Sequence, residues 1–390
     1  MHPLPKRLHS IDVFRAITML FMILVNDVSS VKQIPAWIDH VDANADGLGF
    51  ADAVFPAFLF IVGLSLPFAI KNRLKKRESF FKIAGYIITR SLALLIMGFF
   101  HVNGENYSAT VALPKSVWTI LTTIGFFLIW LDYPATIAKG KKYSLVIGGI
   151  LLLFLMAFLF KGGNPTAPHG MQPEWWGILG IICWAYLVCA TIFLLTKGNL
   201  SFLLSCLAIF ILINISTHLK LIDLHLFVIG DASSVTLVMA GMAVAGIYEK
   251  MAGKGNDASL WLVLTSSAVF FILAGFFIRP FSGGISKIHA TPAWFFICTG
   301  ISLLIFEILV WLIDIKDKRN WFHLIRPGGT STLTCYLVPY FLYSIFSLIH
   351  FNYPAFLNQG IGGLIRSFAI GFLVIGLVGF IEKYRLRLKI

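Results

Sequence analysis

Long apolar segments recur along the whole chain, and they restrict its possible folds more than any other feature of the sequence. Twelve segments are long enough, or nearly so, to cross roughly 30 Å of hydrocarbon. Their approximate limits are 12–31, 52–71, 81–101, 116–133, 143–160, 175–196, 200–216, 228–250, 259–278, 292–314, 329–350 and 360–381. In hydrocarbon the backbone must satisfy its own hydrogen bonds, which favours helices. We therefore predict an all-α, polytopic transmembrane helix bundle of 11–12 helices, the short seventh segment being the weakest.

Charge supports a membrane location and predicts an orientation. Only 13% of the 390 residues are charged, about half the share of an ordinary soluble domain. The net charge of +13 does not indicate nucleic acid as a partner, because the cations collect in short loops between the apolar segments. With both termini in the cytoplasm, 21 of the 31 Lys and Arg residues fall on the inner side and six on the outer side. This bias follows the positive-inside rule.

Most histidines fall on the predicted outer side. Imidazole is the side chain best suited to act as a general base near neutral pH. The alternative interpretation is that these residues are solvated at the membrane interface. The outer histidines are His40, His101, His169, His218, His225, His289 and His350.

Charged residues inside the apolar segments are candidate binding residues because they are costly in hydrocarbon. Asp12 and Arg15 lie three residues apart, on one face of the first predicted helix. They form either a structural ion pair or part of an inward pocket for an anionic ligand. Arg90 lies about ten residues inside the third segment and needs an anionic partner or a wet cavity. Glu307 in the tenth segment is one possible partner for it.

A second group of polar residues lies where the first two predicted helices end on the outer side. Asn26 closes the first helix, and His40 and Asp52 follow in and after the connecting loop. Asp52 is placed to cap the second helix. A carboxylate beside an imidazole also fixes its tautomer, as in arrangements of nucleophile, base and orienting acid. Lys287 precedes the tenth segment on the same side.

Metal and nucleotide motifs are missing from the sequence. The five cysteines have no C-x-x-C spacing, and the chain contains no H-E-x-x-H, so we expect no metal. It also contains no phosphate-binding Gly-Lys-Ser/Thr loop and no G-x-S-x-G. The common soluble-enzyme chemistries are therefore not indicated.

Three stretches resemble the heparan-α-glucosaminide N-acetyltransferase family. They are Arg7-Leu8-His9-Ser10-Ile11-Asp12-Val13-Phe14-Arg15, the pair Val25-Asn26, and residues 50–63, FADAVFPAFLFIVG. The best match covers residues 7–70, and weaker matches follow at 285–287, 326–331 and 336–337. The sequence departs from the family at Ala16, where D-x-F-R-G has its glycine, and in the acidic surroundings of His40.

The resemblance implies an activity and a set of site residues. Members of this family transfer acetyl from cytosolic acetyl-CoA to the amino group of a glucosamine residue across the membrane. The catalytic histidine of the family matches His40, and its asparagine matches Asn26. Asp52 would then orient His40. The residues expected to bind substrate or cofactor are Asp12, Arg15, Arg90 and Lys287.

We accordingly expect residues 1–390 to form a single integral membrane acyltransferase-like domain in a bacterial inner membrane, with His40 on the periplasmic side. His40 would act as a base or as a transient acyl carrier, and the sequence leaves both routes open. The expected partners are acetyl-CoA, an amino-sugar or glycan acceptor and the lipid bilayer; a homodimer is left open. The alternative is a transporter or flippase for a glycan or anionic solute, although no internal repeat supports it. A structural membrane subunit would gain little from Arg90 and Glu307 in mid-helix.

Overall fold

The computed structural model describes residues 8–108, 111, 113–163, 167–222, 227–252 and 257–390. His225 and the predicted inner cations Lys6, Arg7 and Lys254 lie outside the described residues. The elements are α1 (Ser10–Val28), α2 (Phe50–Lys75), α3 (Phe80–Glu105), α4 (Lys115–Trp130), α5 (Lys139–Leu159), α6 (Ile178–Leu195), α7 (Leu200–His218), α8 (Ser233–Met251), α9 (Asp257–Ile278), α10 (Pro292–Leu309), the π-helix η1 (Val310–Ile315), the 3-10 helix η2 (Arg319–Ile325), α11 (Arg326–Thr330), α12 (Thr332–Leu348), the 3-10 helix η3 (Ala355–Leu357) and α13 (Gly360–Glu382).

Each of the twelve predicted segments contains an α-helix, and the prediction of an all-helical bundle is confirmed. The weak seventh segment forms a helix of 19 residues, α7. Helix α10 continues into η1, while the segment η2–α11 meets α12 at a bend of 76°. The helices begin and end within a few residues of the predicted limits because each apolar run is bounded by polar loop residues.

The chain is an integral membrane protein. Among the described residues, eight helices are long and apolar enough to cross a membrane, or nine if the bent pair counts as one span. Only 17% of the apolar stretch is buried in each of α5, α7 and α9, against 67% for α10 with η1. Apolar side chains on such exposed faces are stable in contact with lipid, whereas contact with water would be unfavourable.

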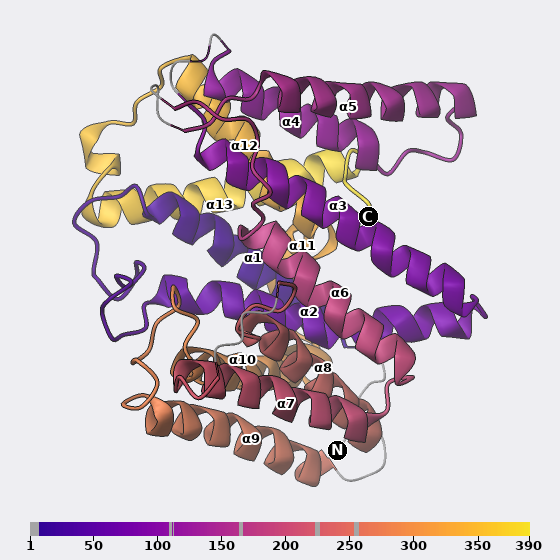
Figure 1. Cartoon of the computed structure of the whole chain (residues 1–390), viewed down its shortest axis with the longest axis vertical. Helices are drawn as coiled ribbons and strands as arrows, with labels where there is room; N and C mark the ends of the chain where they lie inside the picture. The colour runs from indigo at the N-terminus through magenta and orange to yellow at the C-terminus, as the bar shows by residue number, and fades with distance from the viewer. Residues whose placement is uncertain (1–7, 109–110, 112, 164–166, 223–226, 253–256) are drawn as a thin grey trace.

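Helix α1 lies inside the bundle and organises it. It contacts α2, α10, α11, α12 and α13. Figure 1 shows α4 and α5 at one edge of the bundle and α9 at the opposite edge, with α1 and α2 between them. The charged residues of this helix, Asp12, Arg15 and Asp27, are therefore surrounded by neighbouring helices.

The two ends of the bundle are distinguished by their ion pairs. Lys71 pairs with Glu249 at one end, which we call the inner end, where Arg387 also pairs with Asp132 at 3.1 Å. Arg279 pairs with Asp46 at 2.9 Å at the opposite end, which we call the outer end. Helix α1 runs from the inner end to the outer end, and the 29–49 segment then leads back into α2.

A buried network joins the outer end of α1 to α12 and α13. The Arg366 guanidinium donates to Asp27 Oδ2 at 3.0 Å, and both side chains are at most 5% exposed. Ser367 and Tyr343 also donate to the Asp27 carboxylate, at 2.5 Å and 2.7 Å. Arg366 further donates to Asn358 Oδ1 at 2.6 Å. A buried ion pair is tolerated only where additional hydrogen bonds satisfy both partners, as they do here.

Helices α2 and α8 cross at two glycines that allow their backbones to touch. A Cβ at Gly63 would lie 1.9 Å from the carbonyl oxygen of Val238, and one at Gly241 would lie 2.0 Å from that of Phe60. Small residues at such crossings let membrane helices approach closely, which maximises van der Waals contact where no hydrophobic effect drives association.

We predict that Gly63→Ala lowers the stability of the protein by about 3 kcal/mol, because the added methyl group forces the two backbones apart. The thermal unfolding midpoint in detergent measures the effect. Gly85→Ala in α3 is the matched control, because a Cβ there has no neighbour within 4 Å. A midpoint for Gly63→Ala as high as that of the control would contradict the close crossing.

Candidate functional site

The predicted pair of His40 and Asp52 forms at the outer end. His40 Nδ1 lies 2.6 Å from Asp52 Oδ1. Asp52 is 4% exposed in its side chain, whereas His40 is 37% exposed. When Nδ1 carries the proton and donates it to Asp52, the lone pair of Nε2 is left for chemistry. The arrangement is a buried carboxylate beside an accessible imidazole.

Local backbone geometry places Asp52 for this role. Asp52 Oδ2 accepts hydrogen bonds from the backbone N–H of Gly49 at 3.1 Å and of Val41 at 3.0 Å. The first bond belongs to the N-terminal capping box of α2, and the second attaches the residue after His40 to the same carboxylate. Asp52 therefore caps α2 as predicted through Oδ2, and its Oδ1 contacts His40.

Lys287 joins this pair from the segment between α9 and α10. Its Nζ lies 3.2 Å from His40 Nδ1 and 3.5 Å from His40 Nε2, and 4.0 Å from Asp52 Oδ1. Burial lowers the pKa of Lys287 below its ordinary value, so this amine loses its proton at a lower pH than an exposed lysine does. A cation beside an imidazole and a carboxylate suits a negatively charged group on a ligand.

Asp46 attaches the loop that carries His40 to the segment that carries Lys287. Its carboxylate accepts from the Arg279 guanidinium at 2.9 Å and from the backbone N–H of Ile285 at 2.7 Å. The hydrogen bond from Ile285, followed by Arg279, lowers the pKa of Asp46. Trp294 of α10 adds a bond from its indole N–H to the carbonyl of Asp52 at 3.2 Å.

Arg15 and Arg90 line one cavity of about 420 Å³ nearer the inner end. Arg15 pairs with Asp12 at 3.2 Å, as predicted, and also donates to Ser65 Oγ at 2.6 Å and to the carbonyl of Gly329 at 3.1 Å. The predicted ion pair is confirmed, and the paired guanidinium also faces a cavity; that this cavity binds an anionic ligand stays a prediction.

The suggested pair of Arg90 and Glu307 is wrong. Arg90 donates to the Tyr86 hydroxyl at 3.0 Å and lies 5.1 Å from the Tyr186 ring centroid. Glu307 instead accepts from Thr265 at 3.0 Å. Arg90 lines this cavity, whereas no residue of α10, the helix that carries Glu307, lines it. Arg90 therefore faces the cavity and not Glu307.

Four cavities follow one another through the bundle and share lining residues. An inner cavity of about 700 Å³ with Lys71 and Lys75 meets the Arg15–Arg90 cavity at Arg15 and Ser65. That cavity meets an outer cavity of about 340 Å³ at Met19, Ile178, Leu179 and Tyr336. A side cavity of about 270 Å³ continues from the outer one. Lys71, Lys75, Arg15 and Arg90 line the two inner cavities, whereas Glu105 and uncharged polar groups line the outer one.

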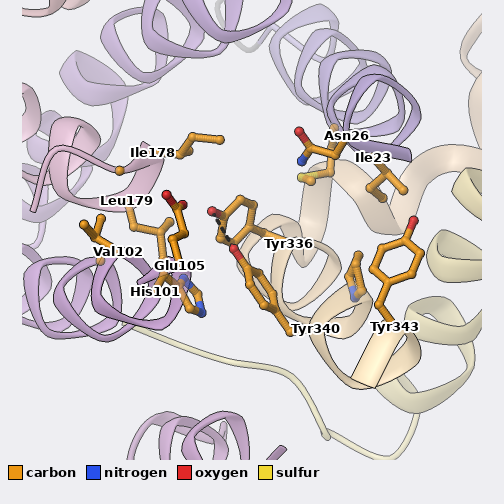
Figure 2. A pocket seen from close by; sticks show the side chains of 14 residues that line it. Ile23, Asn26, His101, Val102, Glu105, Ile178, Leu179, Tyr336, Tyr340 and Tyr343 are labelled. Atoms are coloured by element: carbon orange, nitrogen blue, oxygen red, sulfur yellow. Dashed lines mark hydrogen bonds between the residues drawn. The ribbon is translucent and has the colours of Figure 1, made fainter. Parts of the chain in front are cut away.

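Asn26 lies in the outer cavity and is not in the His40 cluster. Figure 2 shows its amide facing the space between α1, α3 and α12, together with His101, Glu105, Tyr336, Tyr340 and Tyr343. His40 is not among the residues that line these four cavities. The structure thus unites His40, Asp52 and Lys287, places Arg15 with Arg90, and assigns Asn26 to a third location.

Several cavity residues were not singled out by the sequence analysis. Glu105 and Tyr336 face the outer cavity, and Ser65 bonds to Arg15. His101 was noted only as one of the outer histidines. A polar residue every three to four positions in α3, at His101 and Glu105, is the signal that was available, since residues four apart share a helix face.

Comparisons with known proteins agree with this picture. A family model described as "Domain of unknown function (DUF5009)" matches residues 7–220, more than half of the chain. The chain is 38% identical over 104 residues to the human protein named "Heparan-alpha-glucosaminide N-acetyltransferase", and 34% identical over 102 residues to the mouse protein of that name. The matches cover 27% and 26% of this chain and 15% of each relative. The predicted resemblance is confirmed within these limits.

We predict that Asp46→Asn speeds amide hydrogen exchange in the 39–48 loop roughly fivefold. The substitution removes the charged acceptor of Arg279 and Ile285, which lowers the free energy of opening of this loop by about 1 kcal/mol. The pKa of Asp46 is lowered in the folded protein, so its stabilising effect is present above its ordinary pKa of about 3.9 and is lost as the pH falls through the lowered value. Hydrogen exchange by mass spectrometry at pH 7 measures this.

Asp42→Asn is the matched control, because this exposed acid in the same loop has no side-chain bond to the described residues. Equal exchange in the two variants would show that Asp46 does not attach the loop.

Proposed function

The chain belongs to the DUF5009 family, and on that premise we propose that it is an integral membrane acyltransferase. It moves an acetyl group from cytosolic acetyl-CoA to an amino sugar or glycan on the outer side of the membrane. Residues 1–390 act as one domain in a bacterial inner membrane, with both termini in the cytoplasm and His40 on the periplasmic side. The similarity to two N-acetyltransferases over about 100 residues supports the reaction class.

The 2.6 Å contact between His40 and Asp52 is the observation that carries this proposal. Asp52 holds the ring with Nδ1–H directed at its carboxylate, so Nε2 is available to the reaction. In one route Nε2 takes a proton from the acceptor amine while that nitrogen attacks the acetyl carbonyl carbon. The C–S bond then breaks and the CoA thiolate leaves.

In the other route His40 Nε2 attacks the acetyl carbon first and expels the thiolate, and the acceptor amine then displaces the imidazole. Both routes pass through a tetrahedral oxyanion. The Lys287 ammonium, which lies beside His40, is the candidate group to stabilise it at this site. The Asn26 amide lines the outer cavity and would stabilise it only where the reacting carbonyl reaches that cavity. Trapping an acetyl group on His40 without acceptor, detected by mass spectrometry, distinguishes the second route.

Arg15 and Arg90 bind the CoA phosphates in this proposal, with Asp12 holding the Arg15 guanidinium in place. The linked cavities support it, since they lead from Lys71 and Lys75 at the inner end past both arginines toward Asn26. Guanidinium groups recognise phosphates through paired hydrogen bonds. We propose no metal in this site.

The same cavities favour a second candidate, a transporter or flippase without acyl transfer. A path through the bundle is what a carrier requires, whereas the His40–Asp52 pair has no function in it. Thermal stabilisation by acetyl-CoA, followed by acetyl transfer to an acceptor, separates the two functions. A carrier for an unrelated solute shows neither.

We predict that His40→Ala lowers kcat for acetyl transfer from labelled acetyl-CoA to glucosamine about 1,000-fold, because the base or acyl carrier is lost. Asp52→Asn is expected to lower kcat at least 100-fold, since the carboxylate no longer selects the tautomer. His350→Asn is the control, an exposed histidine at the outer end in a left-handed conformation that Asn tolerates. Full activity in His40→Ala would remove the site assignment and keep the enzyme class.

We predict that Arg90→Gln raises the KM for acetyl-CoA about tenfold and leaves kcat within a factor of about three, because a charged hydrogen bond to phosphate contributes about 1.5–3 kcal/mol. Lys383→Gln, an exposed cation near the end of α13, is the matched control. A loss confined to kcat would place Arg90 at the reacting atoms instead of at the phosphates.

A further inference from the structure

The outer cavity combines apolar walls with polar groups of which only Asn26 has a role in the proposed reaction. Ile23, Val102, Ile178 and Leu179 supply apolar surface, and the polar groups come from α1, α3 and α12. Figure 2 shows Glu105, Tyr336 and Asn26 directed into the same space. A volume of about 340 Å³ lies within the range of small-molecule sites.

Both ring nitrogens of His101 are buried at this cavity without a hydrogen-bond partner among the described residues. The ring stacks on Tyr340 with centroids 4.2 Å apart and planes 5° apart, so its orientation is well defined. A neutral imidazole has one donor and one acceptor nitrogen, and burying both without a partner is unfavourable. A ligand hydroxyl can donate to one nitrogen or accept from the other.

Glu105 lies one helical turn beyond His101 on the same face of α3. Its carboxylate makes no hydrogen bond or ion pair with the described residues, although it lines both the outer and the side cavity. Lys115 also lines the side cavity. Its ammonium donates to the backbone carbonyl of Glu105 at 3.5 Å and attracts the Glu105 carboxylate electrostatically without forming an ion pair. A free carboxylate is a strong acceptor for an ammonium group.

The two tyrosines of α12 complete the site. Their hydroxyls lie 3.3 Å apart, so one proton remains free to bond to a ligand. The faces of Tyr340 and Tyr336 provide rigid, negatively polarised surface that attracts cations and C–H groups. Hydroxyl, imidazole, amide and carboxylate groups around an apolar floor suit a compact ligand with several hydroxyls and an amine.

We propose that the outer cavity is the acceptor site: it binds an amine-bearing polyol, with Glu105 receiving the ammonium and His101 bonding to a hydroxyl. This inference rests on the proposed function and assigns His101, Glu105, Tyr336 and Tyr340 to acceptor binding. Asn26 lines the cavity at the end of α1, from which the 29–49 segment leads to His40. The cavity therefore lies beside the start of the segment that carries the proposed base, and His40 itself does not line it.

The test measures binding without acetyl-CoA, so that it does not depend on catalysis. Purified full-length protein in detergent is titrated with glucosamine and with glucose, which lacks the amine, by isothermal calorimetry. Wild type is expected to bind glucosamine at least tenfold more tightly than glucose. Glu105→Gln is expected to weaken glucosamine at least tenfold and leave glucose unchanged, while His101→Gln weakens both sugars.

Glu174→Gln is the matched control, because it removes the same charge at an outer residue that itself lines none of the four cavities. Preserved acetyl-CoA binding shows that a variant is folded, and Glu105→Gln alone decides the outcome if His101→Gln does not fold. Glucosamine binding that both variants leave unchanged overturns the proposal, as does a wild type that binds neither sugar.

Kinetic constants separate the acceptor from the donor. The variants are expected to raise the KM for glucosamine and leave the KM for acetyl-CoA within twofold. A rise confined to acetyl-CoA overturns the proposal and assigns the cavity to the acetyl-bearing arm of the donor. Sugar binding without any acetyl transfer retains the site and rejects the acyltransferase, so the two failures are distinguishable.

Discussion

The neutralisation of charge on α1 is the constraint on which the rest of the structure depends. This helix carries Asp12, Arg15 and Asp27 through a bundle whose outer helices expose apolar surface. An unpaired charge in hydrocarbon is costly, so α1 has to be surrounded by partners. Asp27 is held by Arg366, Ser367 and Tyr343 at the outer end, and Arg15 by Asp12 and Ser65 farther in.

This central position makes α1 part of two sites. One of its faces lines the Arg15–Arg90 cavity with Arg15 and Met19, and the following turns of the same helix line the outer cavity up to Asn26. Its outer end starts the loop that bears His40. The Asp27 network fixes this end against α12 and α13, so Asn26 and the start of the loop are held by buried bonds. Helix α1 thus positions Arg15 and Asn26 directly, and it fixes the start of the segment that carries His40.

Two kinds of polar cluster lie at the outer end. In one, His40, Asp52 and Lys287 make short contacts with one another, and Asp46 bonds to Arg279 and Ile285 of the neighbouring segment. In the other, His101 and Glu105 have no side-chain partner among the described residues. A satisfied cluster is preorganised for a fixed task, whereas the buried nitrogens of His101 and the exposed carboxylate of Glu105 are left for a ligand. The difference explains why we assign the first to chemistry and the second to binding.

The sequence by itself determined the helices, the membrane location and the pair of His40 and Asp52, because hydropathy and capping act between residues near in the chain. Sequence reasoning could not place Asn26 with His101, Lys287 beside His40, or Arg90 away from Glu307. Those relations join residues of different helices, and helix periodicity states which face a residue occupies without stating which helix it meets. Only the tertiary packing around α1, set by close glycine crossings and buried ion pairs, decided them.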